Sequence, residues 1–323
     1  MSKPKVLVTR KWPIAVEEKL KRLFDVTLND QDIALSDDEL KSALQNYDAV
    51  LPTVTDTISA NILHVNNKRT KILGNFGVGF NNIAIDAAKE QGIIVTNTPG
   101  VLTDCTADIA LLLLLMSARR GGEGERHIRS RQWQGWHPTH MLGQKVTGKT
   151  LGFIGFGRIA QAVAHRAHFG FGMNIIFWTP HLPDPKIIDK YQATPCNRIE
   201  DVLSEADFVT LHCPGGAATK HLINEQRLKL MRPSAHLINT ARGEVIDSKA
   251  LIKALQQGWI AGAGLDVFEG EPGIDPQFYS LENITMLPHL GSATETTRLA
   301  MGNRVLDNIS AFFKGEEPKD RIV

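Results

Sequence analysis

The chain has 323 residues, enough for two domains of ordinary size, and its 42% hydrophobic and 22% charged residues are typical of a globular protein. A formal net charge of +1 gives no sign of attraction to nucleic acid or to a membrane surface, so neither is expected as a partner. Three widely spaced cysteines without a CxxC pair argue against a disulfide framework and against a metal site, and they favour a reducing cytoplasm; they are Cys105, Cys196 and Cys213. The most apolar run, 109–116, is too short to cross a bilayer.

Residues 1–99 alternate short apolar runs with amphipathic segments. The apolar runs are typical of strands, at 6–9, 25–28, 49–52, 71–75 and 93–97. Helical patterns lie between them, and Ser36 with Glu39 has the spacing of a capping box. Alternating strands and helices predict a parallel sheet that is covered on both faces.

A second alternating series follows a long predicted helix at 102–120 and an irregular stretch at 121–143. Its predicted strands are 150–155, 174–178, 208–212, 236–240, 261–267 and 284–288. A last helix is expected at 294–313. The fold class is therefore α/β with two doubly wound parallel sheets, and the boundary between them is expected near Pro99.

The segment GFGRIA at 155–160 has the form of a dinucleotide-binding turn, because it follows an apolar strand and opens a helical pattern. Gly155 permits the tight turn, Gly157 lets the backbone approach a pyrophosphate, and Ala160 allows close packing of helix and strand. The free N–H groups of the helix N-terminus would bind the phosphates. The predicted cofactor contacts in this turn are Gly155, Phe156, Gly157, Arg158 and Ile159.

The end of the next strand bears on the choice of cofactor. An acidic residue there would bind the ribose hydroxyls of NAD, but the chain has Thr179, Pro180 and His181, and the first carboxylate is Asp184. Without that carboxylate a 2′-phosphate is not repelled, and Thr179 and His181 could bind it. The arginine usual in such sites is also absent, so NADP(H) is favoured and NAD(H) stays an alternative.

Three segments that look like strands running into loops each carry one chemically distinct side chain: Arg242, Glu271 and His289. Arginine can hold a carboxylate and polarise a carbonyl, histidine can donate a proton near neutral pH, and a glutamate can orient that histidine. Singly, each could be a surface ion pair, a structural histidine or a turn residue. Together, in a dinucleotide-binding domain, they predict hydride transfer to a small 2-keto acid.

Over nearly its whole length the chain resembles the D-isomer-specific 2-hydroxyacid dehydrogenases. The segments that carry the resemblance are 74–83, 98–111, 148–164, 238–247, 262–272 and 287–294. It implies that Arg242, Glu271 and His289 are the catalytic set. It also implies that the backbone N–H groups of Gly77, Val78 and Gly79 bind the substrate carboxylate and that Asp266 contacts the nicotinamide.

The resemblance further implies cofactor contacts at Cys213, Thr240 and Ala241 and a substrate contact at Ser292. It implies a Rossmann nucleotide-binding domain (100–289) inserted in a flavodoxin-like substrate domain (1–99 and 290–323), with the last helix returning to the latter. The active site would lie in the cleft, and the protein would be a homodimer joined through the nucleotide-binding domains.

Within the family, 131–152 and the segment leading to Arg242 look most like glyoxylate and hydroxypyruvate reductases. In those enzymes a paired-tryptophan segment enters the partner subunit's active site, which points to Trp133 and, more strongly, to Trp136; Trp136 could equally be packed in a subunit interface. Other members, acting on D-lactate, phosphoglycerate or 2-ketogluconate, are alternatives. A nucleotide-sensing binding protein without enzyme activity is a further one, which the complete Arg/Glu/His set argues against.

Overall fold

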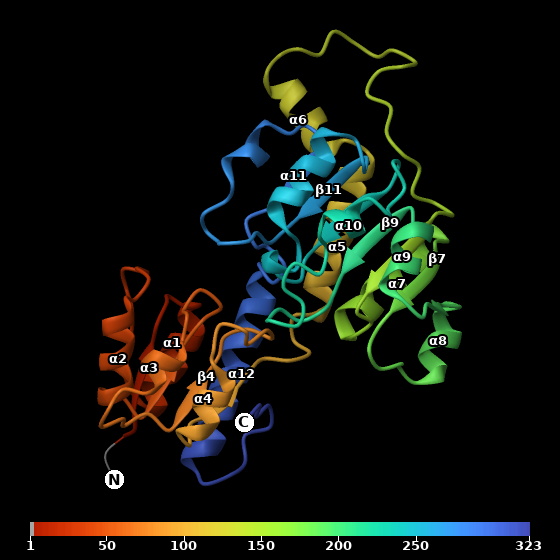
Figure 1. Ribbon diagram of the computed structural model, residues 1–323. Coiled ribbons are helices and arrows are strands. Elements are labelled where there is room, and N and C mark those ends of the chain that lie inside the picture. Colours follow the sequence, from red (N-terminus) through yellow and green to blue (C-terminus); the bar gives the residue numbers. More distant parts are fainter. Residues whose placement is uncertain (1–2) are drawn as a thin grey trace. The chain divides into compact units, whose positions relative to one another are not determined.

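The computed structural model describes residues 3–323, which divide into two compact units (Figure 1). One unit contains the chain up to Leu102 together with Ala293–Val323, and the other is Thr103–Ser292. The predicted boundaries, 99/100 and 289/290, fall a few residues before these positions.

The first unit is a five-stranded, fully parallel sheet in the order β2-β1-β3-β4-β5, which is the flavodoxin-like order. Its strands are β1 (Lys5–Val8), β2 (Asp25–Thr27), β3 (Ala49–Leu51), β4 (Ile72–Gly74) and β5 (Ile94–Thr96). Its helices are α1 (Ile14–Leu23), α2 (Asp37–Asn46), α3 (Ala60–Leu63), α4 (Ile85–Glu90) and α12 (Glu295–Phe313). Helices α1 and α12 pack together, as do α2, α3 and α4, so both faces of the sheet are covered.

Local sequence features explain how two of these helices are placed. The predicted capping box of α2 is confirmed, since the Ser36 hydroxyl accepts the Glu39 N–H and the Glu39 carboxylate accepts the Ser36 N–H. Helix α12 lies against β4, where a Cβ added to Gly74 would be 2.7 Å from the Val305 side chain. A larger residue at Gly74 would separate helix and sheet.

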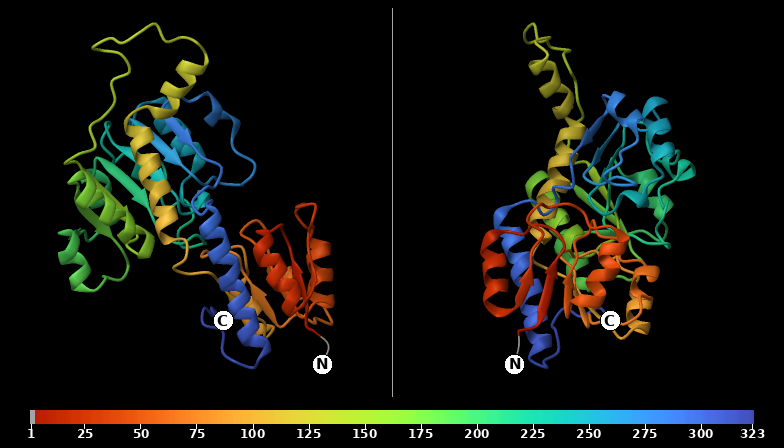
Figure 2. Two further views of the ribbon diagram at one scale, coloured as in Figure 1. Left: turned by 180° about the vertical axis from the view of Figure 1, so that it is seen from behind. Right: turned by 90° about the vertical axis from the view of Figure 1, so that its left-hand side faces the viewer.

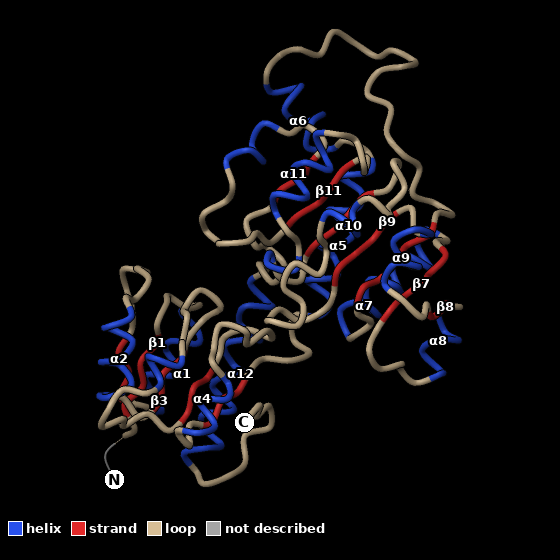
Figure 3. Tube along the Cα trace, in the orientation of Figure 1, coloured by secondary structure: helices blue, strands red, loops and turns tan. Residues whose placement is uncertain are grey.

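The second unit is a seven-stranded parallel sheet in the order β12-β11-β10-β9-β6-β7-β8, the strand order of a Rossmann fold with one further strand (Figure 3). Its strands are β6 (Thr150–Ile154), β7 (Asn174–Trp178), β8 (Thr194–Pro195), β9 (Phe208–Leu211), β10 (His236–Asn239), β11 (Gly262–Leu265) and β12 (Ile284–Met286). Its helices are α5 (Thr103–Ala118), α6 (Gly121–Arg129), α7 (Arg158–Phe171), α8 (Pro185–Tyr191), α9 (Ile199–Glu205), α10 (Glu225–Leu228) and α11 (Ser248–Gln256), with the 3-10 helices η1 (Gly243–Val245) and η2 (Pro276–Ser280). The predicted fold class is confirmed.

Two local predictions differ from the structure. The sequence predicts an irregular stretch at 121–143, but the first part of this stretch is helix α6. Three glycines of low helix propensity obscure the helical pattern in the sequence. Ion pairs such as Arg120–Glu123 and Arg126–Glu282 support the helix. The edge strand β8 was not predicted, because two residues that include a proline show no periodicity. After α6, the loop 130–149 projects beyond the sheet of its own unit (Figure 2).

Each unit has its own core of fully buried side chains, such as Leu51 and Ile72 in the first and Phe153 and Phe208 in the second. Helix α5 accounts for the apolar run at 109–116 and lies against α7 and the strands β10 and β11. Within residues 3–323, none of the helices combines the length and the apolar character that a membrane span requires.

Candidate active site

The cofactor and catalytic residues predicted for the second unit lie where its strands end. Because all seven strands are parallel, their carboxyl ends meet at one edge of the sheet, which is where open α/β sheets bind ligands. Strand β6 leads into the turn 155–160, β7 into 179–181 and β9 into Cys213. Strand β10 leads into 240–242, β11 into Asp266 and β12 into His289.

The turn after β6 has the backbone that a pyrophosphate needs. Gly155 has φ 87°, and an added Cβ would lie 2.8 Å from the carbonyl of His212, so only glycine fits. Gly157 is the N-cap of α7 and makes no side-chain cap, and no atom from elsewhere in the described chain lies within 4 Å of the position of its missing Cβ. The N–H groups of this helix end are therefore open to an anion.

Phe156 has a different surrounding from its neighbours in the turn. Its ring is 4% exposed and stacks on Phe177 with the ring centroids 4.3 Å apart. The side chain thus belongs to the core, and only its backbone is available to a cofactor. Arg158 is exposed and Ile159 half-buried, while Ala160 is fully buried, as close helix–strand packing requires.

The end of β7 offers no carboxylate to a ribose. Thr179 is half-buried, and Pro180 and His181 are exposed. The Asp184 carboxylate accepts the Lys186 N–H at 2.8 Å and caps α8. That carboxylate is therefore already used within its own loop.

Two buried side chains lie at the ends of β9 and β10. Burial raises the pKa of the Cys213 thiol to about 11, so it stays protonated and unreactive near neutral pH. The Thr240 hydroxyl is buried and has no hydrogen-bond partner among residues 3–323. Such a hydroxyl is normally satisfied by a bound group or water, so Thr240 and the half-buried Ala241 beside it fit the edge of a cofactor site.

Arg242 is placed by the last residue of β10. The Asn239 amide donates to the Arg242 carbonyl at 2.8 Å and accepts the Ala241 N–H at 2.9 Å, which fixes the backbone on both sides of the turn. Burial lowers the pKa of the Arg242 guanidinium, and the nearby carboxylates of Glu271 and Glu244 oppose that effect. Arginine titrates so far above neutral pH that the side chain remains a cation.

Gly243 brings Arg242 close to the loop that carries Glu271. A Cβ on Gly243 would lie 1.8 Å from the carbonyl carbon of Phe268, far inside any permitted contact. The two backbones can approach only because the side chain is absent.

Glu271 and His289 form the direct pair that the sequence suggested. The Glu271 Oε2 lies 2.9 Å from the His289 Nδ1, and its Oε1 accepts the Phe268 N–H at 2.7 Å. Burial alone would raise the pKa of Glu271, but its bonds to His289 and Phe268 and the charge of Arg242 hold that pKa below its ordinary value. Glu271 is thus a carboxylate at neutral pH, and the Nε2 of His289 is turned away from it.

Asp266 fixes the backbone that directly follows His289. It is 1% exposed, and its two oxygens accept the N–H groups of Leu290 at 2.6 Å and Gly291 at 2.8 Å. Burial raises the pKa of Asp266, and these two hydrogen bonds oppose the rise. His289 itself has φ 55°, a backbone conformation that costs a non-glycine residue about 1–3 kcal/mol and is common at functional sites.

In the first unit, the loop Gly77–Gly79 follows β4, and all three of its carbonyls accept hydrogen bonds from within that unit. The Asn75 amide donates to Gly79 at 2.9 Å and to Gly77 at 3.4 Å, the Asn97 amide donates to Val78 at 2.8 Å, and the Thr98 N–H donates to Gly77 at 3.1 Å. In a trans peptide the N–H points opposite to the preceding C=O. The N–H groups of Val78 and Gly79 therefore face away from these donors.

Neither of these two N–H groups donates a hydrogen bond within the described part of the chain, and both residues are half-buried. Successive backbone N–H groups without partners can form an anion-binding concavity. This local geometry supports the predicted carboxylate contact for Val78 and Gly79. It does not support the same role for Gly77, because the Gly77 N–H already donates to the Asn75 carbonyl at 2.9 Å.

Ser292 and Trp136 are the other two residues predicted to contact the substrate. Ser292 is half-buried and directly follows Gly291. Trp136 is 80% exposed on the loop 130–149, so within a single chain it has no core to pack against.

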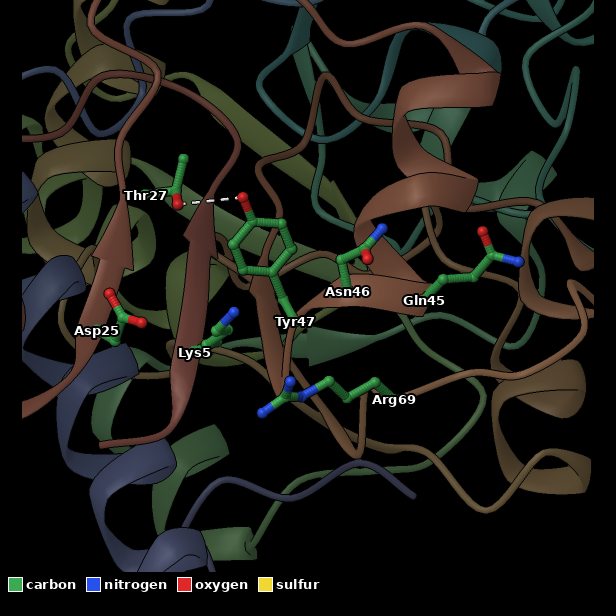
Figure 4. Close-up of a pocket in the computed structure, with 7 residues that line it drawn as sticks. All are labelled: Lys5, Asp25, Thr27, Gln45, Asn46, Tyr47 and Arg69. Carbon is green, nitrogen blue, oxygen red and sulfur yellow. Dashed lines mark hydrogen bonds between the residues drawn. The ribbon is translucent and has the colours of Figure 1, made fainter. Parts of the chain in front are cut away.

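A hollow of about 230 Å³ lies elsewhere in the first unit, at the amino ends of its strands (Figure 4). Its lining side chains are Lys5, Asp25, Thr27, Gln45, Asn46, Tyr47 and Arg69. The Tyr47 hydroxyl bonds that of Thr27 at 3.0 Å, and Arg69 pairs with Asp48, so these lining side chains are already engaged with one another or with a neighbour. Over residues 3–323 no group of three or more possible metal ligands is assembled.

Sequence reasoning missed the residues that hold the loops, namely Asn75, Asn97 and Asn239. Each is a short amide that ends a strand or directly follows one. That position is a signal that could have been used, since an amide there can satisfy loop carbonyls and N–H groups at once.

The sequence and the fold of this chain are similar to those of known proteins. The model of the D-isomer specific 2-hydroxyacid dehydrogenase NAD binding domain matches residues 111–291. A glyoxylate reductase of Thermococcus litoralis is 44% identical over 324 residues, which cover 99% of this chain and 97% of the relative. The chain belongs to this family. It is therefore an oxidoreductase that uses a nicotinamide cofactor and a small keto acid substrate, as the sequence predicted.

Other relatives span the whole chain as well. A glycerate dehydrogenase of Hyphomicrobium methylovorum is 38% identical and covers 98% of both chains. A solved NADPH-dependent glyoxylate/hydroxypyruvate reductase from Sinorhizobium meliloti, in complex with NADP and malonate, has a TM-score of 0.89 at 32% identity and covers 100% of this chain and 97% of its own. A D-isomer specific 2-hydroxyacid dehydrogenase from Polaromonas has a TM-score of 0.91 at 35% identity and covers 99% of each chain.

Glu271→Gln is expected to shift the pH profile of keto acid reduction. The charge of His289 helps to lower the pKa of Glu271, so the Glu271 carboxylate stabilises that charge in return; a neutral amide does so less, and the decline on the alkaline side should begin at a lower pH. Initial rates of reduction between pH 5 and 10 would measure the shift.

Glu269→Gln is the matched control, because Glu269 lies on the same loop but pairs with His221, at 2.7 Å. An equal shift in both variants, or in neither, would contradict the Glu271–His289 coupling.

Proposed function

We propose that this protein reduces glyoxylate and hydroxypyruvate to glycolate and D-glycerate. The observation that carries the proposal is the Glu271–His289 pair, set at the strand ends of a dinucleotide-binding sheet together with the Arg242 cation. Glyoxylate reductases of Thermococcus and Pyrococcus species, 42–44% identical over nearly the full length, support the substrate. The glycerate dehydrogenase relative supports hydroxypyruvate as the second one.

His289 has the geometry of a proton donor. Its Nδ1 is engaged by Glu271, so Nε2 is the nitrogen that gives its proton to the substrate carbonyl oxygen. A nicotinamide held at the strand ends of the second unit would supply the hydride that the carbonyl carbon accepts. As the alkoxide forms and takes the proton, Glu271 stabilises the charge of the ring, and the product is the hydroxy acid.

Arg242 has the chemistry to polarise the carbonyl and hold the substrate carboxylate, because a guanidinium offers two parallel N–H donors. We assign a second contact with the carboxylate to the N–H groups of Val78 and Gly79, because the carbonyls of the same two peptide groups, those of Gly77 and Val78, are held from the opposite side. Asp266 acts by fixing the His289 backbone and lies where a nicotinamide contact is expected.

His289→Ala should lower kcat for glyoxylate by about 10²–10⁴-fold with a much smaller change in KM, since the proton moves only as the alkoxide forms. His168→Ala, which removes a half-buried histidine of α7 whose ring bonds the Met173 carbonyl at 3.2 Å, serves as the control. Steady-state kinetics on glyoxylate, hydroxypyruvate, pyruvate and 2-ketogluconate would test both role and substrate. Near-full activity of His289→Ala, or wild-type preference for another keto acid, would overturn the proposal.

For the cofactor we propose NADP(H) ahead of NAD(H). The end of β7 lacks a carboxylate, because Asp184 caps α8, and the Thr179 hydroxyl and exposed His181 are available to a 2′-phosphate. The solved Sinorhizobium relative in complex with NADP supports the same choice.

Thr179→Asp should move the preference toward NADH by repelling the 2′-phosphate. Thr194→Asp, which adds the same charge on the edge strand β8, should not. The measurement is kcat/KM for both cofactors. A wild-type preference for NADH above about tenfold, or about 1.4 kcal/mol, would contradict the proposal.

We also propose a homodimer, formed in the cytoplasm through the second unit. Leu112 on α5 and Phe169 on α7 are 41% and 58% exposed beside an open hollow of about 710 Å³ that is largely apolar. The loop 130–149 adds the exposed rings of Trp133 and Trp136. A second copy of the chain would cover these apolar surfaces, and Trp136 would then enter the partner's active site.

Trp136→Ala should relax selectivity toward larger keto acids while leaving the KM of the cofactor nearly unchanged, because a ring that narrows the pocket would be lost. Trp133→Ala, on the same loop, is the control. Sedimentation and a substrate panel would be run on both variants. A weaker dimer with an unchanged substrate ranking would assign Trp136 to the interface alone.

A further inference from the structure

The end of the chain pairs with the edge strand β5 of the first unit through an isolated antiparallel bridge. Ile322 donates its N–H to Val95 at 2.7 Å, Val95 donates to Val323 at 3.3 Å, and Arg321 pairs antiparallel with Thr96. The segment 320–323 thus covers the edge of β5, which would otherwise be open. In the same register the Asn97 N–H donates to the Asp320 carbonyl at 3.2 Å.

The side chains of Asp320 and Asn308 form a buried polar cluster where the tail meets α12. They are 9% and 1% exposed. The Asn308 amide donates to the Asp320 carboxylate at 3.1 Å, its oxygen accepts the Asp320 N–H at 3.2 Å, and Arg304 reaches the same carboxylate at 3.5 Å. The cluster joins α12 to the tail of the chain.

The cluster is also connected, through Asn97, to the loop Gly77–Gly79. The Asn308 amide reaches the Asn97 carbonyl at 3.4 Å, and the Asn97 amide donates to the Val78 carbonyl at 2.8 Å. Asn97 is therefore held from the tail and from α12 on one side and holds Val78 on the other. Turning the Val78 carbonyl also turns the Gly79 N–H, because both belong to one rigid peptide plane.

We propose that Asp320, Asn308 and Asn97 are positioning residues for substrate binding, and that they aim the Gly79 N–H at the keto acid carboxylate. This inference rests on the proposed function of the loop. None of the three side chains need touch the substrate. Their effect comes from fixing one peptide plane, and a misplacement of about 1 Å can cost about 10²-fold in rate.

Asp320→Ala and Asn97→Ala are each expected to raise KM for glyoxylate about tenfold, and to raise the Ki of oxamate, a planar carboxylate analogue, by a similar factor. The KM for NADPH should change less than about twofold, because the cofactor turn belongs to the second unit. Asp320→Asn keeps an oxygen for the Asn308 amide and should restore most of the affinity. Glu317→Ala is the control, since Glu317 lies on the same tail but pairs with the exposed Arg321 and is not part of the buried cluster.

Thermal unfolding of each variant separates positioning from stability. A lower Tm with an unchanged KM for glyoxylate and an unchanged Ki for oxamate in both alanine variants would overturn the inference. Gly77→Ala, whose Cβ would lie 2.8 Å from the Val54 side chain, tests the loop itself. If Gly77→Ala leaves the glyoxylate KM unchanged, the proposed function of the loop fails. If Gly77→Ala raises KM and the tail variants do not, the positioning role alone fails.

Discussion

The reactive end of the second unit depends on one buried carboxylate, that of Asp266. Its hydrogen bonds to the N–H groups of Leu290 and Gly291 hold the chain just beyond β12, where His289 adopts a left-handed backbone conformation. Without that anchor, the strained residue could relax to a commoner conformation and move its ring from Glu271. The cost of burying a carboxylate is offset by two short charge-assisted hydrogen bonds.

The same device recurs with amides in both units. Asn239 fixes the turn at Arg242, and Asn75 and Asn97 fix the loop at Gly77–Gly79. In each place a short side chain at a strand end satisfies loop groups, and the chemically active groups are left pointing elsewhere. Catalysis by positioning requires this kind of rigidity, because flexible loops would lose the preorganisation that lowers a barrier.

Glycines decide how closely these rigid pieces approach one another. Gly243 lets the Arg242 turn lie on the backbone of Phe268, and Gly155 lets the nucleotide turn lie on the carbonyl of His212. Both contacts bring backbone against backbone, so no flexible side chain could move away to make room for a Cβ. A change at either position would displace a reactive group that lies several residues away.

Periodicity and motif spacing are local properties of the chain, so the sequence was enough to predict the α/β class, nearly all strands by their position along the chain, and the capping box at Ser36. It also predicted that Arg242, Glu271 and His289 follow strands. It did not reveal α6, whose glycines are poor helix formers, or β8, which is too short to show a period. The anchoring of the His289 backbone by Asp266 and the pairing of the tail 320–323 with β5 became visible only in the folded structure. Each joins residues far apart in the sequence, and no local pattern encodes which distant partner a polar side chain will meet.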